Sequence, residues 1–136
     1  MSKLNGRKLV TQLIRAYKEE AKLYDGLERS VIEQRDLLLN GRDPRLLAHL
    51  VEHQRHLAED IGKIEAAIAP LRDHWERIRD GQLSVDVRRL GDALDEILER
   101  LAERIHAIVE IEKDNTRELL AATNIDRVSQ WLPNEY

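Results

Sequence analysis

Four residues in the middle of the chain have the types and spacing of a metal site. They recur every three or four residues, so their side chains would share one stripe of a helix: His49, His53, His56 and Asp60. Imidazoles four residues apart can chelate zinc. The stripe lies away from the apolar positions of the same segment, on a face that ordinarily meets solvent. We therefore expect no metal site in this stripe and no cofactor.

A second pattern, Glu103-x-x-His106, is half of the carboxylate-bridged di-iron signature, which needs such a motif on each of two helices. No other histidine has a glutamate three residues before it. The chain also lacks cysteine, a glycine-rich phosphate loop and a Gly-x-Ser-x-Gly nucleophile motif. With no catalytic candidate, the sequence favours a binding protein over an enzyme.

Composition narrows the class of partner. Charged residues make up 35% of the chain and hydrophobic residues 42%, which is typical of a globular domain. The net charge is −4 and no segment concentrates basic residues, so nucleic acid is not an expected partner. No ten apolar residues follow one another, which argues against membrane insertion. The absence of cysteine fits a reducing compartment, and we expect a cytoplasmic protein.

Two short stretches combine the signals of a helix end with those of a helix start. Asp43 can cap a helix whose first turn holds Pro44, and Gly41 can take the left-handed conformation that follows a helix. Gly81 and Ser84 repeat this pattern. The resulting boundaries are a helix at about 5–40, one at about 44–79, one at about 84–122, and a C-terminal segment at 123–136.

Apolar residues in each helical segment recur at alternating steps of three and four. The middle segment is the most regular, and only Gln54 is polar among its seam positions Leu47, Leu50, Gln54, Leu57, Ile61, Ile64, Ile68, Leu71, Trp75 and Ile78. This heptad pattern predicts coiled-coil-like packing, and Pro70 interrupts it only as a kink. Because the loops are short, neighbouring helices should run antiparallel. The sequence thus predicts one all-α domain over 1–136, an elongated antiparallel bundle of three long helices with a short C-terminal amphipathic segment.

The C-terminal segment has its own apolar stripe. Thr123 and Asp126 could cap a new short helix, which predicts a break or hinge after the third helix. The stripe consists of Ile125, Val128, Trp131 and Leu132. It is either a last turn folded onto the bundle or a mobile hook that takes a partner helix. Trp75 lies on the heptad seam and is expected in the core.

A rod of three helices covers each apolar stripe only in part. A fourth helix, a second copy of the chain or a client protein is therefore expected to fill the remaining surface.

Two parts of the sequence resemble one known family. They are the hairpin containing Tyr24-Asp25-Gly26-Leu27-Glu28, Glu33 to Pro44 and Leu50 to Gln54, and the later run Glu112-Lys113-Asp114-Asn115-Thr116-Arg117-Glu118-Leu119-Leu120. Both look like the corresponding stretches of FlgN-type flagellar export chaperones, which are all-helical and of similar length.

This resemblance implies a cytoplasmic chaperone that keeps hook-associated flagellar proteins unassembled and delivers them to the type III export apparatus. It also implies that the client's C-terminal helix binds the chaperone's C-terminal region, which here corresponds to Leu119, Leu120, Ile125, Val128, Trp131 and Leu132. The alternative is a coiled-coil scaffold or assembly factor that acts as a homodimer through its long seam.

Overall fold

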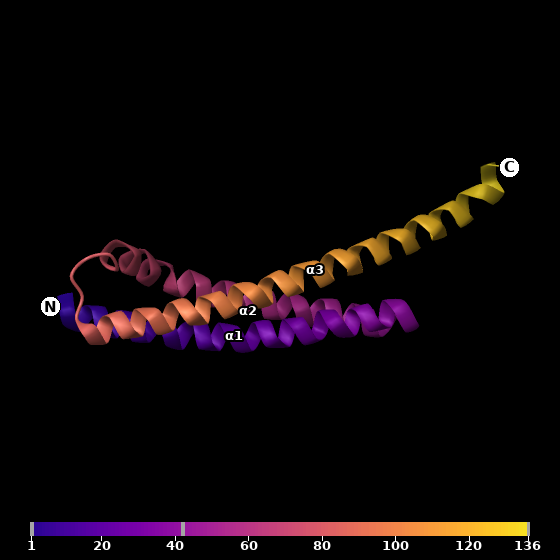
Figure 1. Ribbon diagram of the computed structural model, residues 1–136. Coiled ribbons are helices and arrows are strands. Elements are labelled where there is room, and N and C mark those ends of the chain that lie inside the picture. The colour runs from indigo at the N-terminus through magenta and orange to yellow at the C-terminus, as the bar shows by residue number, and fades with distance from the viewer. Residues whose placement is uncertain (1, 42, 136) are drawn as a thin grey trace.

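The computed structural model has three long helices and confirms the all-α class (Figure 1). They are α1 (Ser2–Asn40), α2 (Pro44–Ile78) and α3 (Val85–Glu135). The structure describes the backbone of residues 2–41 and 43–135 and the side chains of residues 6–41 and 43–121. Thirty-five residues at about 1.5 Å each make even the shortest helix about 50 Å long. The fold is therefore a thin rod.

The two connections use the predicted caps. The Asp43 carboxylate accepts hydrogen bonds from the backbone N–H of Arg45 at 3.0 Å and of Leu46 at 3.5 Å. Ser84 Oγ accepts one from the N–H of Val87 at 3.2 Å. The left-handed conformation expected for Gly41 is not observed, because no described glycine has a positive φ. The chain turns instead at Asp43, which is extended because a following proline disfavours the helical conformation.

α3 departs most from the predicted boundaries. Its helix continues without a break through Thr123 to Glu135, so the separate segment at 123–136 is not observed. The capping pattern at Thr123 is optional, since neither glycine nor proline occurs between Gly91 and Pro133 to force a helix to end. Figure 1 shows the C-terminal part of α3, in yellow, running past the ends of the other two helices.

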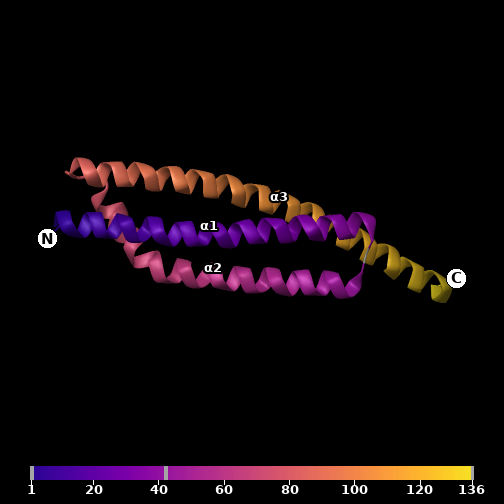
Figure 2. The same ribbon diagram turned by 90° about the horizontal axis from the view of Figure 1, so that it is seen from below.

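α1 is the shared neighbour of the other two helices. It packs along both α2 and α3, whereas no α-carbon of α2 lies within 8 Å of one of α3 in the described residues. Figure 2 shows α1 between them over most of the rod. In the same view the last part of α2 changes direction and crosses α1 toward α3. The helix continues through Pro70, as predicted. α2 and α3 therefore meet mainly at one end.

We call this end of the rod the closed end; α1 and α3 begin there, and α2 ends there. We call the opposite end, where α1 ends and α2 begins, the open end. The larger core cluster extends from the closed end and includes Leu13, Tyr17, Ile68, Trp75 and Leu94. A smaller cluster lies toward the open end and contains Leu27, Val31, Ile61 and Ile108. The apolar core thus thins from one end of the rod to the other.

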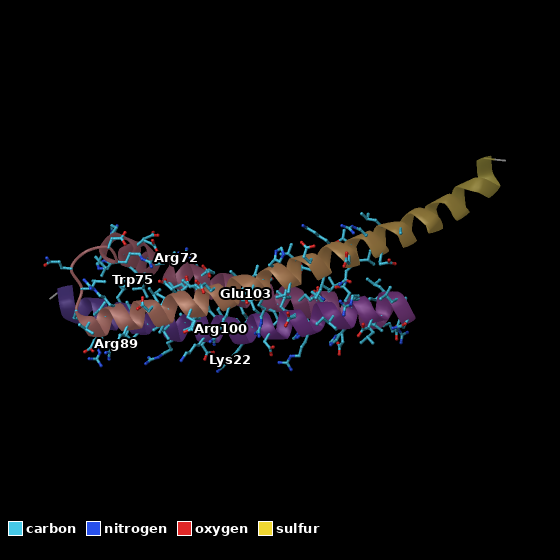
Figure 3. The ribbon with its side chains drawn as sticks, viewed as in Figure 1. Lys22, Arg72, Trp75, Arg89, Arg100 and Glu103 are labelled. Atoms are coloured by element: carbon cyan, nitrogen blue, oxygen red, sulfur yellow. The ribbon has the colours of Figure 1, made fainter. Side chains whose placement is uncertain are left out.

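Trp75 joins α2 to α3 at the closed end (Figure 3). Its indole covers Gly91, where an added Cβ would lie 2.8 Å from Cζ2 of the ring. The guanidinium carbon of Arg79 lies over the Trp75 ring, 5.8 Å from its centre. Arg79 Nη2 also donates to the two carboxylate oxygens of Asp95 at 3.0 and 3.2 Å. Trp75 is therefore a core residue, as expected, and its position depends on the missing side chain at residue 91.

This fit predicts opposite effects for two glycine substitutions. Gly91→Ala should lower the free energy of unfolding by about 1–3 kcal/mol, because forcing the buried indole aside costs more than the roughly 1 kcal/mol that alanine gains in a helix. Gly62→Ala is the control, since residue 62 is exposed in the interior of α2 with no atom near its Cβ position. It should raise stability by up to about 1 kcal/mol. Urea denaturation measures both, and an equal gain in both variants would contradict the fit.

Candidate partner-binding surface

One face of α3 contacts α2 near the closed end and is exposed to solvent nearer the C-terminus of the helix. Near the closed end it contacts α2 through Gly91 and Asp95, and Leu98 and Ile105 continue it as partly buried members of the larger core cluster. The steps between these residues are four, three and seven, so they occupy one stripe about 80° wide. This face is the one that a complete three-helix bundle would cover with α2.

The same face is uncovered nearer the C-terminus of α3. Steps of four, seven and four carry it from Ile105 to Val109, Thr116 and Leu120, and Glu112 and Lys113 occupy the turn between Val109 and Thr116. Val109 is 39% exposed, Leu120 is 57% exposed, and Thr116 is also exposed. We call Val109, Thr116 and Leu120 the bare stripe. Its apolar side chains are Val109 and Leu120, whereas Glu112, Lys113 and Arg117 surround Thr116 on the same surface. Burial of the two apolar side chains would stabilise a complex by about 25 cal/mol per Å².

α2 has a matching uncovered surface. Arg79 of α2 bonds to α3. Counting back from Arg79 in steps of seven gives Arg72, Glu65, Ala58 and Val51. Ala58 is exposed and Val51 is 50% exposed. Glu65 and Arg72, on the same line of α2, lie beside Glu20 and Tyr17 of α1. Both α2 and α3 thus have exposed apolar residues toward the open end, as the partly covered stripes predicted.

The predicted partner-binding residues fall into two groups. Leu119 and Leu120 are 40% and 57% exposed near the point where α3 leaves α1. They differ in direction, because Leu119 follows Ile108 and Asn115 on the face toward α1, whereas Leu120 continues the bare stripe. The other four predicted residues have side chains outside the described part of the structure: Ile125, Val128, Trp131 and Leu132. Sequence analysis missed Val109, although its four-residue step from Ile105 could have identified it.

A layer of amides joins the three helices beside the smaller core cluster. Gln54 on α2 donates to Oε1 of Gln34 at 3.0 Å and to Oγ of Ser30 at 3.2 Å. Asn115 on α3 donates to the carbonyl oxygen of Val31 at 3.0 Å and to the same Gln34 oxygen at 3.5 Å. Gln34 is thus a common acceptor for both other helices. Such buried polar contacts fix the register of helices that apolar side chains alone would leave free to slide.

Glu20 is a polar residue within the apolar pattern of α1; it lies in the middle of the rod and is 1% exposed. Burial, followed by the neighbouring Glu65, raises the pKa of its carboxyl to about 8, and Arg72 opposes this shift. Arg72 Nη1 donates to Glu65 at 2.6 Å. Glu65 and Arg72 thus lie beside the carboxyl group of Glu20, which is itself closed to solvent.

The raised pKa predicts how stability depends on pH. Between the ordinary glutamate pKa and about 8, the folded chain holds a proton at Glu20 that the unfolded chain releases. Stability should therefore be greatest at low pH and fall as the pH rises toward 8, by at most about 1.4 kcal/mol per unit. Glu20→Gln should flatten this slope, and Glu103→Gln, on an exposed surface of α3, should not. Urea denaturation from about pH 5 to about pH 8.5 measures the slopes, and a flat wild-type profile would contradict the buried proton.

The histidine stripe faces solvent. His49, His53 and His56 are exposed on α2, and His56 lies 3.3 Å from Glu52 and 3.9 Å from Glu59. Over the described residues, no three His, Cys, Asp or Glu side chains are grouped to hold a metal ion. Glu103 and His106 are also exposed, on the side of α3 that its heptad pattern turns outward.

Comparison with known proteins identifies no relative: no family model, curated protein or solved structure matches the chain. Within the described residues, no helix combines the length and apolar character needed to cross a bilayer. The function must therefore be argued from the rod itself.

Proposed function

We propose that this protein is a helix-binding chaperone, and not an enzyme, which masks an amphipathic helix of a client until the client is handed on. The client helix lies along the bare stripe and the continuing face of α3. By resemblance to the FlgN-type family, the clients are hook-associated flagellar proteins, the site of action is the cytoplasm, and the recipient is the type III export apparatus.

The observation that carries the proposal is the change of neighbour along α3. The face that meets α2 through Gly91 and Asp95 reaches Val109 and Leu120, which are exposed in the described part of the structure. An amphipathic helix with anchors at steps of three and four would cover these two side chains. Val51 on α2 is a further apolar residue that is 50% exposed.

The long helix also suits reversible capture. α3 extends past the ends of α1 and α2 (Figure 1), so a client helix has a partner along more than the bare stripe. We include the four predicted residues of this extension, Ile125, Val128, Trp131 and Leu132, in the proposed surface by resemblance to the FlgN-type family. A contact made of one or two helix faces is small enough to release its client, since standard stable interfaces bury about 1,600 Å².

Isothermal titration with synthetic peptides of the C-terminal helices of hook-associated proteins tests this proposal. Val109→Ser combined with Leu120→Ser should weaken binding by about tenfold or more, because each removes about 1 kcal/mol or more of apolar burial. Trp131→Ala combined with Leu132→Ala should weaken binding similarly. Helicity and the melting temperature should change little in either variant, since Val109 and Leu120 are exposed in the free chain.

Val85→Ser is the matched control, because Val85 is a 66% exposed apolar residue at the closed end. It should bind the peptides like the wild type. Sedimentation of the free chain separates the two classes of function. A tight dimer that loses its affinity in the Val109 and Leu120 variant, with no heat from any peptide, would support the scaffold alternative and contradict the chaperone proposal.

A further inference from the structure

α2 consists of two parts that meet at Pro70. The part after Pro70 is tied to α3 by the contacts of Trp75 and Arg79. The part before it, residues 44–69, which we call the cover, bonds to α1 through Gln54. Proline has no N–H, so the helix lacks one backbone hydrogen bond where the two parts meet. Sharp bends in helices occur at prolines for this reason. The structure thus has a pivot between a fixed part of α2 and the cover.

A buried carboxyl group lies under the cover, close to this pivot. Glu20 of α1 is 1% exposed, and its Oε1 has no hydrogen-bond partner in the described part of the chain. The cover places a second carboxyl group, that of Glu65, beside it. Arg72, two residues beyond Pro70, donates to Glu65 at 2.6 Å. The bond between Glu65 and Arg72 therefore spans the pivot, and the guanidinium is engaged by the carboxylate of the cover.

The other groups around Glu20 supply no positive charge to it. On α1, Tyr17 and Tyr24 lie one turn before and one turn after Glu20, and burial raises the pKa of both hydroxyl groups, which stay neutral. On α3, Arg104 donates to a backbone carbonyl of α1 at 3.3 Å and lies 3.7 Å from Asp25. Ionisation of Glu20 would therefore add a second negative charge to a buried cluster that has one cation, which is costly.

We infer that the cover is a hinged segment, docked on α1 while Glu20 is protonated and released from it, with Pro70 as the pivot, when Glu20 ionises. Release brings water to the carboxylate and removes the cost of burying its charge. It also uncovers Leu27 and Val31, which are buried apolar residues of α1 packed against the cover in the smaller core cluster. The hinge thus hides an apolar surface of α1 at low pH and presents it at higher pH. It requires no client, so it is independent of the proposed function.

The pH range of the hinge follows from the same surroundings. Burial, followed by the neighbouring Glu65, raises the pKa of Glu20 to about 8 while the cover is docked. Release returns the carboxyl group to water and to an ordinary pKa. The ratio of released to docked chains should therefore rise with pH by up to about tenfold per unit and level off above about pH 8.

Distances between spin labels in the full chain test this inference. The chain has no cysteine, so labels attach only at introduced pairs. Glu33→Cys with His53→Cys places labels at exposed positions of α1 and of the cover. Between about pH 6 and about pH 9 this cover pair should gain a population of longer distances. Arg77→Cys with Asp92→Cys is the matched control pair, at exposed positions of α2 and α3 near the closed end, and its distances should not change.

Substitutions within the cover pair identify the group that titrates. Glu20→Gln should keep the short distance at every pH, whereas Glu103→Gln, on an exposed surface of α3, should respond like the unsubstituted cover pair. Glu20→Met is a second variant without a titrating group, for use if the glutamine variant does not fold. Pro70→Ala restores an N–H at the pivot and should reduce the released population at high pH. Circular dichroism shows whether each variant is folded.

Three outcomes would overturn the inference. The first is a cover pair whose distances are the same at all pH values. The second is a change in the cover pair and the control pair together, which would mean general unfolding and not movement at a hinge. The third is a pH response that persists after Glu20 has been replaced, which would assign the titration to another group.

Discussion

The rod depends on α1, which buries one side against α2 and another against α3. Because α2 and α3 do not approach each other along most of their length, every layer of the core is closed by α1. Val10, Leu13 and Val31 on α1 and Leu94 on α3 are almost fully buried. The third interface of the bundle exists where α2 turns across α1 and sets Trp75 against Gly91. The bare stripe follows from this unequal arrangement.

This arrangement explains the two polar residues within the apolar seam of α1, Glu20 and Gln34. A purely aliphatic seam would allow α2 and α3 to slide along α1 by a heptad at little cost. Glu20 pairs with α2 through Glu65, and Gln34 bonds to both α2 and α3. The hydrogen bonds of Gln34 form in this register and would be lost in others. The polar positions that interrupt the apolar pattern therefore specify which residues of the three helices meet.

Much of the fold could be predicted from the sequence, because the signals are local. Heptad spacing gives the buried face of each helix, and Asp43 and Ser84 mark helix starts that depend only on neighbouring backbone groups. Which helices are neighbours is a long-range property, so the central position of α1 and the contact between Trp75 and Gly91 were not predictable. Leu120 was predicted because the stretch that contains it resembles a family motif. Val109, which is exposed on the same stripe of α3, was not predicted. The proposed break at Thr123 failed because a cap residue permits a helix to start without requiring the preceding helix to end.

The parallel pairing of α1 with α3 has a consequence for biosynthesis. Asn115 bonds to the carbonyl group of Val31, 84 residues earlier in the chain. The α1–α2 hairpin needs only a short loop closure, so it should form first, and α3 docks later across a much larger separation. While the ribosome is still producing the third helix, the side of α1 that faces α3 therefore stays exposed as an apolar surface.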